Sequence, residues 1–473
     1  MKQSLHILKK DISYLRYDIA ITLLAVLAFT FAATRGIGAL DAFLPVTWWF
    51  LIARVIHAEA LPGHRQFWVT RPYDWRSLLG AKLLFILIFV NLPLLIADMV
   101  IVHAAGFSAS HEIPGLLWAQ VLLMLAFVLP AAAFSAITSG MGQLLFMTLL
   151  LVIGMLALLI FGSSIHWGSP WFQLEWVRTD CLLTQLAAVA AIVLLWQYAR
   201  RNTFGTRVLA GASALVLVAT GSLLPWNAAF ALQTRISPTN ISPTSIRIAL
   251  DLDRKWLGQV YATGHDRIVA DLPLQITGIP AGTILRPNGL ALRLIAPDGE
   301  TWVANQPPPD SFDSEAGITS LRLAMGRAFY TKVRDEPLEL RGRLFFTLYG
   351  NEQSVSIPLD GRPVRVNHVL CSAGAHFLHC DSVFRTPIEL IAARIVQNSP
   401  GGPKTTTKNP FPNTSYSPFP ADLRVNPLYQ SFFSPYAETI SDLYIDAFEP
   451  LAYQEQDFKI DHVRLHDFPE ALH

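Results

Sequence analysis

The sequence predicts a bundle of membrane-spanning α-helices followed by a mainly β, sandwich-like domain outside the cytoplasm. The 473-residue chain is 52% hydrophobic and only 15% charged, whereas soluble proteins average roughly 45–50% and about 25%. Long apolar runs dominate residues 19–226, and residues 229–473 have the composition of a water-soluble chain. Apolar and polar residues alternate in this second part, as they do in half-buried strands. We therefore predict a membrane domain at 1–228 and a β-rich domain at 229–473.

The membrane domain contains seven predicted transmembrane helices. Each comes close to the roughly 20 apolar residues that cross about 30 Å of hydrocarbon. The second is the weakest of the seven, because Asp41 and Arg54 lie near its ends. The predicted spans are Ile19–Thr34, Ala39–Ile56, Leu83–Val102, Leu116–Ile137, Leu144–Phe161, Cys181–Tyr198 and Val208–Trp226.

Positive charge in the short loops orients these spans. If all seven cross, the N-terminal segment, residues 57–82 and residues 199–207 share one side and carry eleven Lys and Arg residues. The opposite short loops carry only Arg35 and Arg178. The positive-inside rule therefore places the N-terminus in the cytoplasm and the β-rich domain outside it. The mixed segment before the first span is expected to be retained, since six more spans follow.

The first residues form a predicted amphipathic helix. Its apolar residues recur at three- and four-residue spacing, which is typical of a helix lying along the inner membrane surface. A short helix packed against the bundle has the same pattern, and both interpretations stay open. The apolar stripe is Leu5, Leu8, Ile12 and Leu15, and the residues turned away from it are Lys9, Lys10 and Asp11.

Few polar residues interrupt the spans, and Asp98 is the one acidic residue among them that lies away from the weak second span. An ionisable group inside a membrane is costly, which makes it a functional candidate. Asp98 lies about 24 Å along its span at 1.5 Å per residue, close to the outer interface. We therefore favour a solvated or hydrogen-bonded end residue. The other polar residues are Asn91, Gln120 and Gln185.

The loop at residues 57–84 is the most informative segment. Pro62-Gly63 marks a turn, and the four residues from Gln66 are amphipathic. Asp74 is placed to cap a helix that begins at Trp75 and continues through Lys82 into the third span. Such a loop lies in the headgroup region and presents positive charge to the cytoplasm.

This loop resembles that of the membrane subunits of type-2 ATP-binding-cassette (ABC) exporters, in which it joins the second and third spans. Residues 67–72, Arg76, Leu78, Leu79 and 82–84 carry the resemblance, which covers about the first 230 residues. It implies a bacterial plasma (inner) membrane protein surrounded by lipid, a dimer of identical or different permeases, and an ABC ATPase partner. It also implies that the loop couples to that ATPase, through Arg65, Phe67, Trp68, Arg71, Pro72, Asp74, Arg76 and Lys82.

Two features limit what the resemblance implies. The seventh span and the large outer domain depart from simple family members, so the substrate stays open. A plain basic interfacial loop is the alternative for residues 57–82. The chain has no GxxxxGK[ST] phosphate-binding loop, so ATP hydrolysis by that route requires a separate subunit.

The outer half shows strand-like alternation in three stretches, 246–252, 268–276 and 338–348. Asn288-Gly289, Asp298-Gly299 and Asp360-Gly361 are predicted turns between strands, and together these features predict a β-sandwich or a pair of small β units. Residues 398–420 are rich in Pro, Thr and Asn, and predict a long exposed loop.

The outer half has no signal of catalysis. It lacks a GxSxG elbow and an HExxH pair, so we predict no enzyme, no catalytic or metal-binding residue and no cofactor. Cys371 and Cys380 are expected to form a disulfide in an oxidising compartment. The alternative is a soft-metal site that uses these cysteines with His368, His376 and His379.

Two functions follow from these observations. The first is the permease subunit of an ATP-driven exporter, and the second is a membrane-anchored binding or sensor protein. Seven spans exceed what an anchor needs, which favours transport. A formal net charge of +1 without any Lys/Arg-rich block argues against a nucleic-acid partner.

Overall fold

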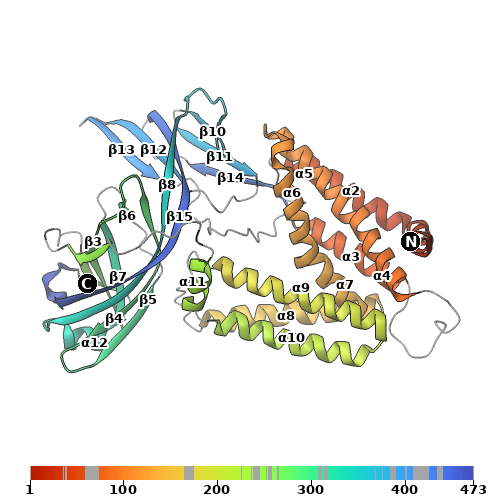
Figure 1. Cartoon of the computed structure of the whole chain (residues 1–473), viewed down its shortest axis with the longest axis horizontal. Coiled ribbons are helices and arrows are strands. Elements are labelled where there is room, and N and C mark those ends of the chain that lie inside the picture. The colour runs from red at the N-terminus through yellow and green to blue at the C-terminus, as the bar shows by residue number, and fades with distance from the viewer. Residues whose placement is uncertain are drawn as a thin grey trace.

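Helices form the first half of the chain and strands dominate the second, as Figure 1 shows. This confirms a helical part followed by a β-rich part. The structure is a computed structural model, and it describes residues 2–35, 37, 40–58, 74–164, 175–224, 226–235, 237, 246–251, 253, 258–263, 266–306, 312–313, 318–367, 369–374, 376–383, 390–399, 402–408, 425–433 and 440–471.

The helical part follows the predicted order of spans. Its elements are α1 (Lys2–Tyr14), α2 (Arg16–Ala33), α3 (Phe43–His57), α4 (Trp75–Ile86), η3 (Leu87–Asn91), α5 (Leu92–Ala104), α6 (Ala109–Leu123), η4 (Met124–Val128), α7 (Leu129–Ala136), α8 (Met141–Ser164), α9 (Glu175–Arg200), α10 (Thr203–Leu223) and α11 (Trp226–Arg235).

Five helical segments within the described part are long and apolar enough to cross a membrane. They coincide with the first, third, fourth, sixth and seventh predicted spans. The second and fifth predicted spans correspond to shorter apolar helices, Phe43–His57 and Met141–Gly154. At 1.5 Å per residue, the 15 residues of α3 cover about 22 Å. That is less than about 30 Å of hydrocarbon, so the second crossing stays a prediction.

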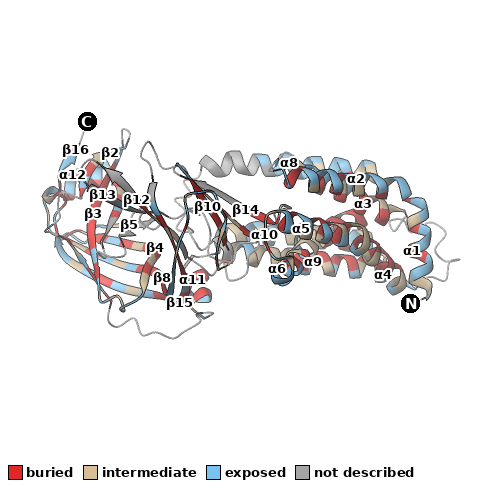
Figure 2. Ribbon diagram, turned by 90° about the horizontal axis from the view of Figure 1, so that it is seen from above, coloured by how far each residue is buried: buried red, intermediate tan, exposed pale blue. Residues whose placement is uncertain are grey.

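Apolar side chains cover the outward face of the helices. On α2, Ile21, Leu24, Leu27 and Phe31 are between 59% and 65% exposed, while Phe29 is buried in the bundle core. Figure 2 shows exposed residues along α2 and α8 in the same way. Soluble proteins rarely expose contiguous apolar patches of this kind. These faces fit contact with lipid.

Two of the long helical segments contain a wide π-helical turn, which the sequence analysis did not predict. Residues 75–104 form α4, η3 and α5, and residues 109–136 form α6, η4 and α7. Each wide turn ends two residues before a proline, Pro93 or Pro130. Proline removes a backbone donor and disturbs the regular helical ladder. π-turns of this kind often occur at functional sites.

The β-rich part forms three sheets, with strand orders β16-β2-β3-β7-β6 (with β1 paired to β3), β14-β11-β10-β9 and β13-β12-β15-β8-β4-β5. The strands are β1 (Arg247–Leu250), β2 (Gln259–Ala262), β3 (Arg267–Thr277), β4 (Ile284–Ile295), β5 (Thr301–Gln306), β6 (Phe312–Asp313), β7 (Ile318–Gly326), β8 (Leu338–Ser356), β9 (Val364–Val366), β10 (Val369–Gly374), β11 (Phe377–Val383), β12 (Leu390–Ser399), β13 (Gly402–Lys408), β14 (Leu428–Phe433), β15 (Ile440–Val463) and β16 (Glu470–Ala471); a short helix, α12 (Arg327–Val333), follows β7.

Two long antiparallel strands, β8 and β15, run through the third sheet and curve across the β-rich part (Figure 1). Leu344 and Phe346 of β8 belong to a core shared with the first sheet. Leu443 and Ile445 of β15 belong to a separate core shared with the β9–β11 and β14 sheet. The β-rich part is therefore a pair of packed β units that share one long curled sheet, which matches the second of the two predicted arrangements.

The predicted strands are confirmed and the predicted turns are partly wrong. β3 and β8 contain the stretches 268–276 and 338–348, and β1 covers residues 247–250 of the stretch 246–252. Positive backbone φ angles at Gly299 and Gly361 confirm two of the turns. The Asn288-Gly289 turn is wrong. These residues lie within β4 at a register shift, and the buried Asn288 Nδ2 donates to Thr347 Oγ1 at 2.7 Å. The hydrogen bond from Asn288 to Thr347 therefore stabilises this pair of residues within a strand, where the sequence predicted a turn.

The loop prediction at 398–420 is wrong for its first part. Gly402–Lys408 forms strand β13, which pairs with β12 as an antiparallel hairpin. Pairing with β12 outweighs the turn-forming composition of this segment, because strand formation depends more on packing against the neighbouring strand than on the intrinsic preference of each residue. Residues 409–424 lie outside the described part.

Candidate functional site

Most of the predicted coupling loop lies outside the described residues, since residues 59–73 are not described. The predicted site residues that fall there are Arg65, Phe67, Trp68, Arg71 and Pro72. Of the remaining three, Asp74 is the N-cap of α4, Arg76 lies in its first turn and Lys82 lies two turns further along. They locate the point at which the loop enters the helical bundle.

The first turn of α4 begins at Trp75, as predicted. Asp74 occupies the N-cap with an extended backbone, but its carboxylate accepts no capping hydrogen bond. Arg76 is exposed, and its guanidinium lies 5.3 Å from the ring centroid of Trp75. This distance is within the range of a cation–π contact. The first turn therefore presents a positive charge that is held against an aromatic ring.

Lys82 points the other way, into the bundle. Its Nζ donates to Asp11 Oδ2 at 2.8 Å, and both side chains are 1% exposed. The pair joins α1 to α4, two helices that pack along each other. Lys82 is thus not brought together with Arg76 on one surface. Because an unpaired buried charge is very costly, this pair fixes how α1 sits against α4.

Asp11 is a residue that sequence reasoning misplaced. It was expected to face away from the apolar stripe, and it is buried with Ile7, Leu8 and Leu15 on the face that packs against the bundle. Leu5, expected in the stripe, is 53% exposed. The sequence spacing could have revealed that Asp11 is buried. It lies four residues from both Ile7 and Leu15, and residues four apart share one face of a helix.

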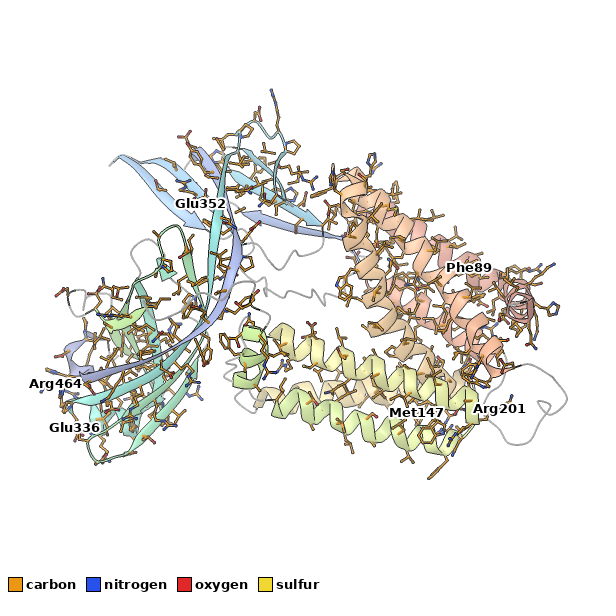
Figure 3. The ribbon with its side chains drawn as sticks, in the orientation of Figure 1. Phe89, Met147, Arg201, Glu336, Glu352 and Arg464 are labelled. Atoms are coloured by element: carbon orange, nitrogen blue, oxygen red, sulfur yellow. A yellow bond between two sulfur atoms is a disulfide. The ribbon has the colours of Figure 1, made fainter. Side chains whose placement is uncertain are left out.

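A second polar cluster lies inside the bundle. Gln120 Nε2 of α6 donates to Asp98 Oδ2 of α5 at 3.3 Å, and Asn91 Nδ2 donates to Gln120 Oε1 at 3.2 Å. Asp98 is 2% exposed. Of the two states expected for Asp98, solvated or hydrogen-bonded, the structure shows the hydrogen-bonded one, and the side chain is buried. Figure 3 labels Phe89, which lies in the wide turn η3 that ends at Asn91.

The β-rich part contacts the turn between α5 and α6. Arg365 Nη2 of β9 donates to Glu112 Oε1 of α6 at 2.9 Å, and its guanidinium lies 5.9 Å from the Phe107 ring. Leu370 of β10 packs against the bundle core. Gly106 has a φ of +91°, which a glycine adopts without strain. The small sheet is therefore docked on the α5–α6 turn.

A second contact joins α11 to the middle of the long sheet. The rings of Phe230 and Phe345 are 4.3 Å apart, in an edge-to-face arrangement that aromatic pairs prefer. Tyr453 N donates to Ser237 Oγ at 3.0 Å, and burial raises the pKa of Tyr453 to about 12. Its phenol is therefore neutral in the physiological range. The two contacts place the β-rich part against the helices at separate points.

Cys371 and Cys380 form a disulfide, as predicted. They face each other directly in the β10–β11 hairpin and are fully buried. Their thiols are therefore not available to a metal, and His379 Nε2 instead lies 3.3 Å from Asp381 Oδ1. No metal-binding group of three or more such side chains occurs among the described residues.

Thiol titration should find one reactive cysteine, Cys181, in the unreduced and denatured protein, and two more after reduction. Replacing both Cys371 and Cys380 by serine should lower the unfolding free energy by roughly 2.5–3 kcal/mol, because the bridge restricts the unfolded chain. Chemical unfolding of the double serine variant and of the oxidised wild-type protein measures the loss. Three reactive thiols before reduction would rule out the bridge.

Comparison with known proteins does not assign the chain to a family. No protein-family model and no curated protein sequence matches the chain. One solved structure with a weak similarity is the transglutaminase of red sea bream, at 7% identity and a TM-score of 0.11. The match covers 54% of this chain, and it spans about a third (35%) of the transglutaminase.

Proposed function

We propose that the protein is the membrane subunit of an ATP-driven exporter and works with a separate ABC ATPase. The observation that supports this most is the buried Lys82–Asp11 pair. It fastens α1 to α4, and α4 is the helix into which the basic loop at 59–73 leads. A push on the loop would then move the inner surface helix and the third span as one unit.

In this proposal, the loop, α1 and the start of α4 face the cytoplasm, and the β-rich part lies outside the bacterial plasma membrane. The eleven-to-two bias of positive charge supports this orientation. The small sheet rests on the α5–α6 turn through Arg365 and Glu112. This contact gives the outer part a direct connection to the turn that joins the third span, which α4 begins, to the fourth span.

The second candidate is a membrane-anchored binding or sensor protein. The Arg365–Glu112 contact also supports this second candidate, because it would transmit a movement caused by ligand binding in the outer part to α6. The two functions differ in their partners. An exporter subunit requires an ATPase, and a sensor does not.

Copurification separates them. The tagged protein, extracted in mild detergent from its native cells, should bring down a protein with a GxxxxGK[ST] phosphate-binding loop, identified by mass spectrometry. A matched extraction of an unrelated multi-span protein of the same cells gives the background. If no such protein is enriched even after chemical cross-linking in intact cells, the exporter proposal is wrong and the sensor is favoured.

The orientation has its own test in single-cysteine labelling. In a Cys181→Ser background, a membrane-impermeant maleimide added outside intact spheroplasts should label a cysteine at Glu300 and not one at Thr70. The bridged Cys371 and Cys380 do not react. Labelling at Thr70 becomes visible after the membrane is permeabilised, which controls for accessibility. Equal labelling of both positions from outside would contradict the seven-span arrangement.

A further inference from the structure

We infer that Asn91, Asp98 and Gln120 form a proton-binding site within the membrane, in which the Asp98 carboxylate takes up the proton. The inference rests on the proposed membrane position of α5 and α6. It does not depend on an ATPase partner. The site would connect the state of the α5–α6 hairpin to the proton concentration on one side of the membrane.

The three residues come from two facing segments. Asn91 ends the wide turn η3, and Asp98 lies seven residues further, so both lie on the same face of the segment. Gln120 reaches them from α6 and bridges the two through its amide. Their exposed fractions are 5%, 2% and 8% respectively. The cluster is therefore closed to solvent in this conformation.

The hydrogen bonds of the cluster leave two oxygens unused. Asp98 Oδ1 and Asn91 Oδ1 are buried and accept no hydrogen bond from any residue that the structure describes. Buried polar atoms are usually hydrogen-bonded, and leaving one unpaired costs about 1–3 kcal/mol. Both unused atoms are acceptors, so the cluster lacks a hydrogen. One proton on the Asp98 carboxylate supplies it and converts an unused acceptor into a donor.

Within the described part of the chain, no cation compensates the charge of Asp98. Among the described residues it makes no ion pair, and its one partner is the neutral amide of Gln120. The titratable residues of α2, α5 and α6, the helices packed around it, lie towards the helix ends. An isolated carboxylate in a low-dielectric interior neutralises by taking a proton. These end residues are Arg16, Tyr17, Asp18, His103, His111 and Glu112.

A metal ion fits the cluster less well. Calcium and magnesium bind six or more oxygen ligands, whereas the cluster offers the Asp98 carboxylate and Asn91 Oδ1, with Gln120 Oε1 already occupied. A proton needs a single oxygen. The chemistry of the cluster therefore favours a proton from water, which the carboxylate binds and later returns to water.

The two wide turns give the site a way to open. η3 ends at Asn91, and η4 begins four residues after Gln120. Pro93 and Pro130 follow these turns, and kinks in helices arise at prolines and π-turns. Bending at either position would expose the cluster to water. The proton would then be taken up or released in one conformation and held in the other.

Infrared spectroscopy of the purified chain in lipid vesicles tests the inference. The wild-type protein should show the carbonyl stretch of a protonated carboxylic acid, and Asp98→Asn should lose this component completely. Asp98→Asn keeps the shape and the acceptor for Gln120. The control Asp74→Asn removes an exposed carboxylate and should leave the component unchanged. Spectra are recorded from about pH 4 to about pH 9, on both sides of the ordinary range for aspartate.

A second variant keeps the test valid if Asp98→Asn does not fold. Gln120→Leu leaves the carboxyl in place and removes its hydrogen-bond donor, so the carbonyl stretch should persist and shift to higher frequency. The inference would be overturned if the protonated-carboxyl component were the same in the wild type, in Asp98→Asn and in Gln120→Leu. Loss of the component on addition of Na⁺ at constant pH would also overturn it, in favour of a cation site.

Discussion

Replacing Lys82 by methionine should lower the stability of the helical part by about 3–5 kcal/mol. Lys82 and Asp11 are each 1% exposed, and their ion pair joins α1 to α4. Methionine has a similar length and no charge, so the change leaves the Asp11 carboxylate buried without its lysine. The loss should be seen as a lower midpoint of unfolding in a mixed-micelle titration followed by tryptophan fluorescence.

The double variant Asp11→Asn with Lys82→Met is the matched control. It removes both charges together, and replacing a whole buried ion pair by neutral groups is often close to neutral. We therefore expect it to recover most of the stability that Lys82→Met loses. If the double variant is as unstable as the single one, packing of the lysine stem rather than the ion pair holds α1 against α4.

Reversing the charge at Arg71 and Arg76 together should abolish stimulation of the partner ATPase and leave the membrane subunit folded. This expectation rests on the resemblance to the exporter family and on the exposed position of Arg76 at the start of α4. Two glutamates in place of two arginines change the local charge by four units at the proposed docking surface. The ATPase rate of the reconstituted complex, with and without the membrane subunit, measures the effect.

Arg200→Glu with Arg201→Glu gives the matched control, because it makes the same charge change at the turn between α9 and α10. That variant should keep most of the stimulation, since its site lies outside the loop. Figure 3 labels Arg201 at this turn. Full stimulation in the Arg71 and Arg76 variant would assign residues 57–82 to a plain interfacial loop.

Local patterns in the sequence were sufficient to predict several elements of the fold. Apolar runs of about 20 residues predict the long helices, and five of them have the length to cross a membrane. Alternation over 268–276 and 338–348 predicts β3 and β8, and Asp-Gly pairs predict two turns. The disulfide between Cys371 and Cys380 was predicted from the oxidising compartment expected for the outer domain. For the helices, strands and turns, neighbouring residues carry the whole signal.

Contacts between residues far apart in the chain could not be predicted from local patterns and follow from the packing of the fold. Lys82 and Asp11 are 71 positions apart, and Arg365 and Glu112 are 253 apart. Hydrophobic periodicity states which face of a helix is buried, but it does not state what the face packs against. Asp11 shows this directly, because a polar residue on a buried face becomes favourable once α4 supplies a lysine. The pairing of β8 with β15 and the burial of Asp98 likewise depend on neighbours that packing, and not local sequence, brings into contact.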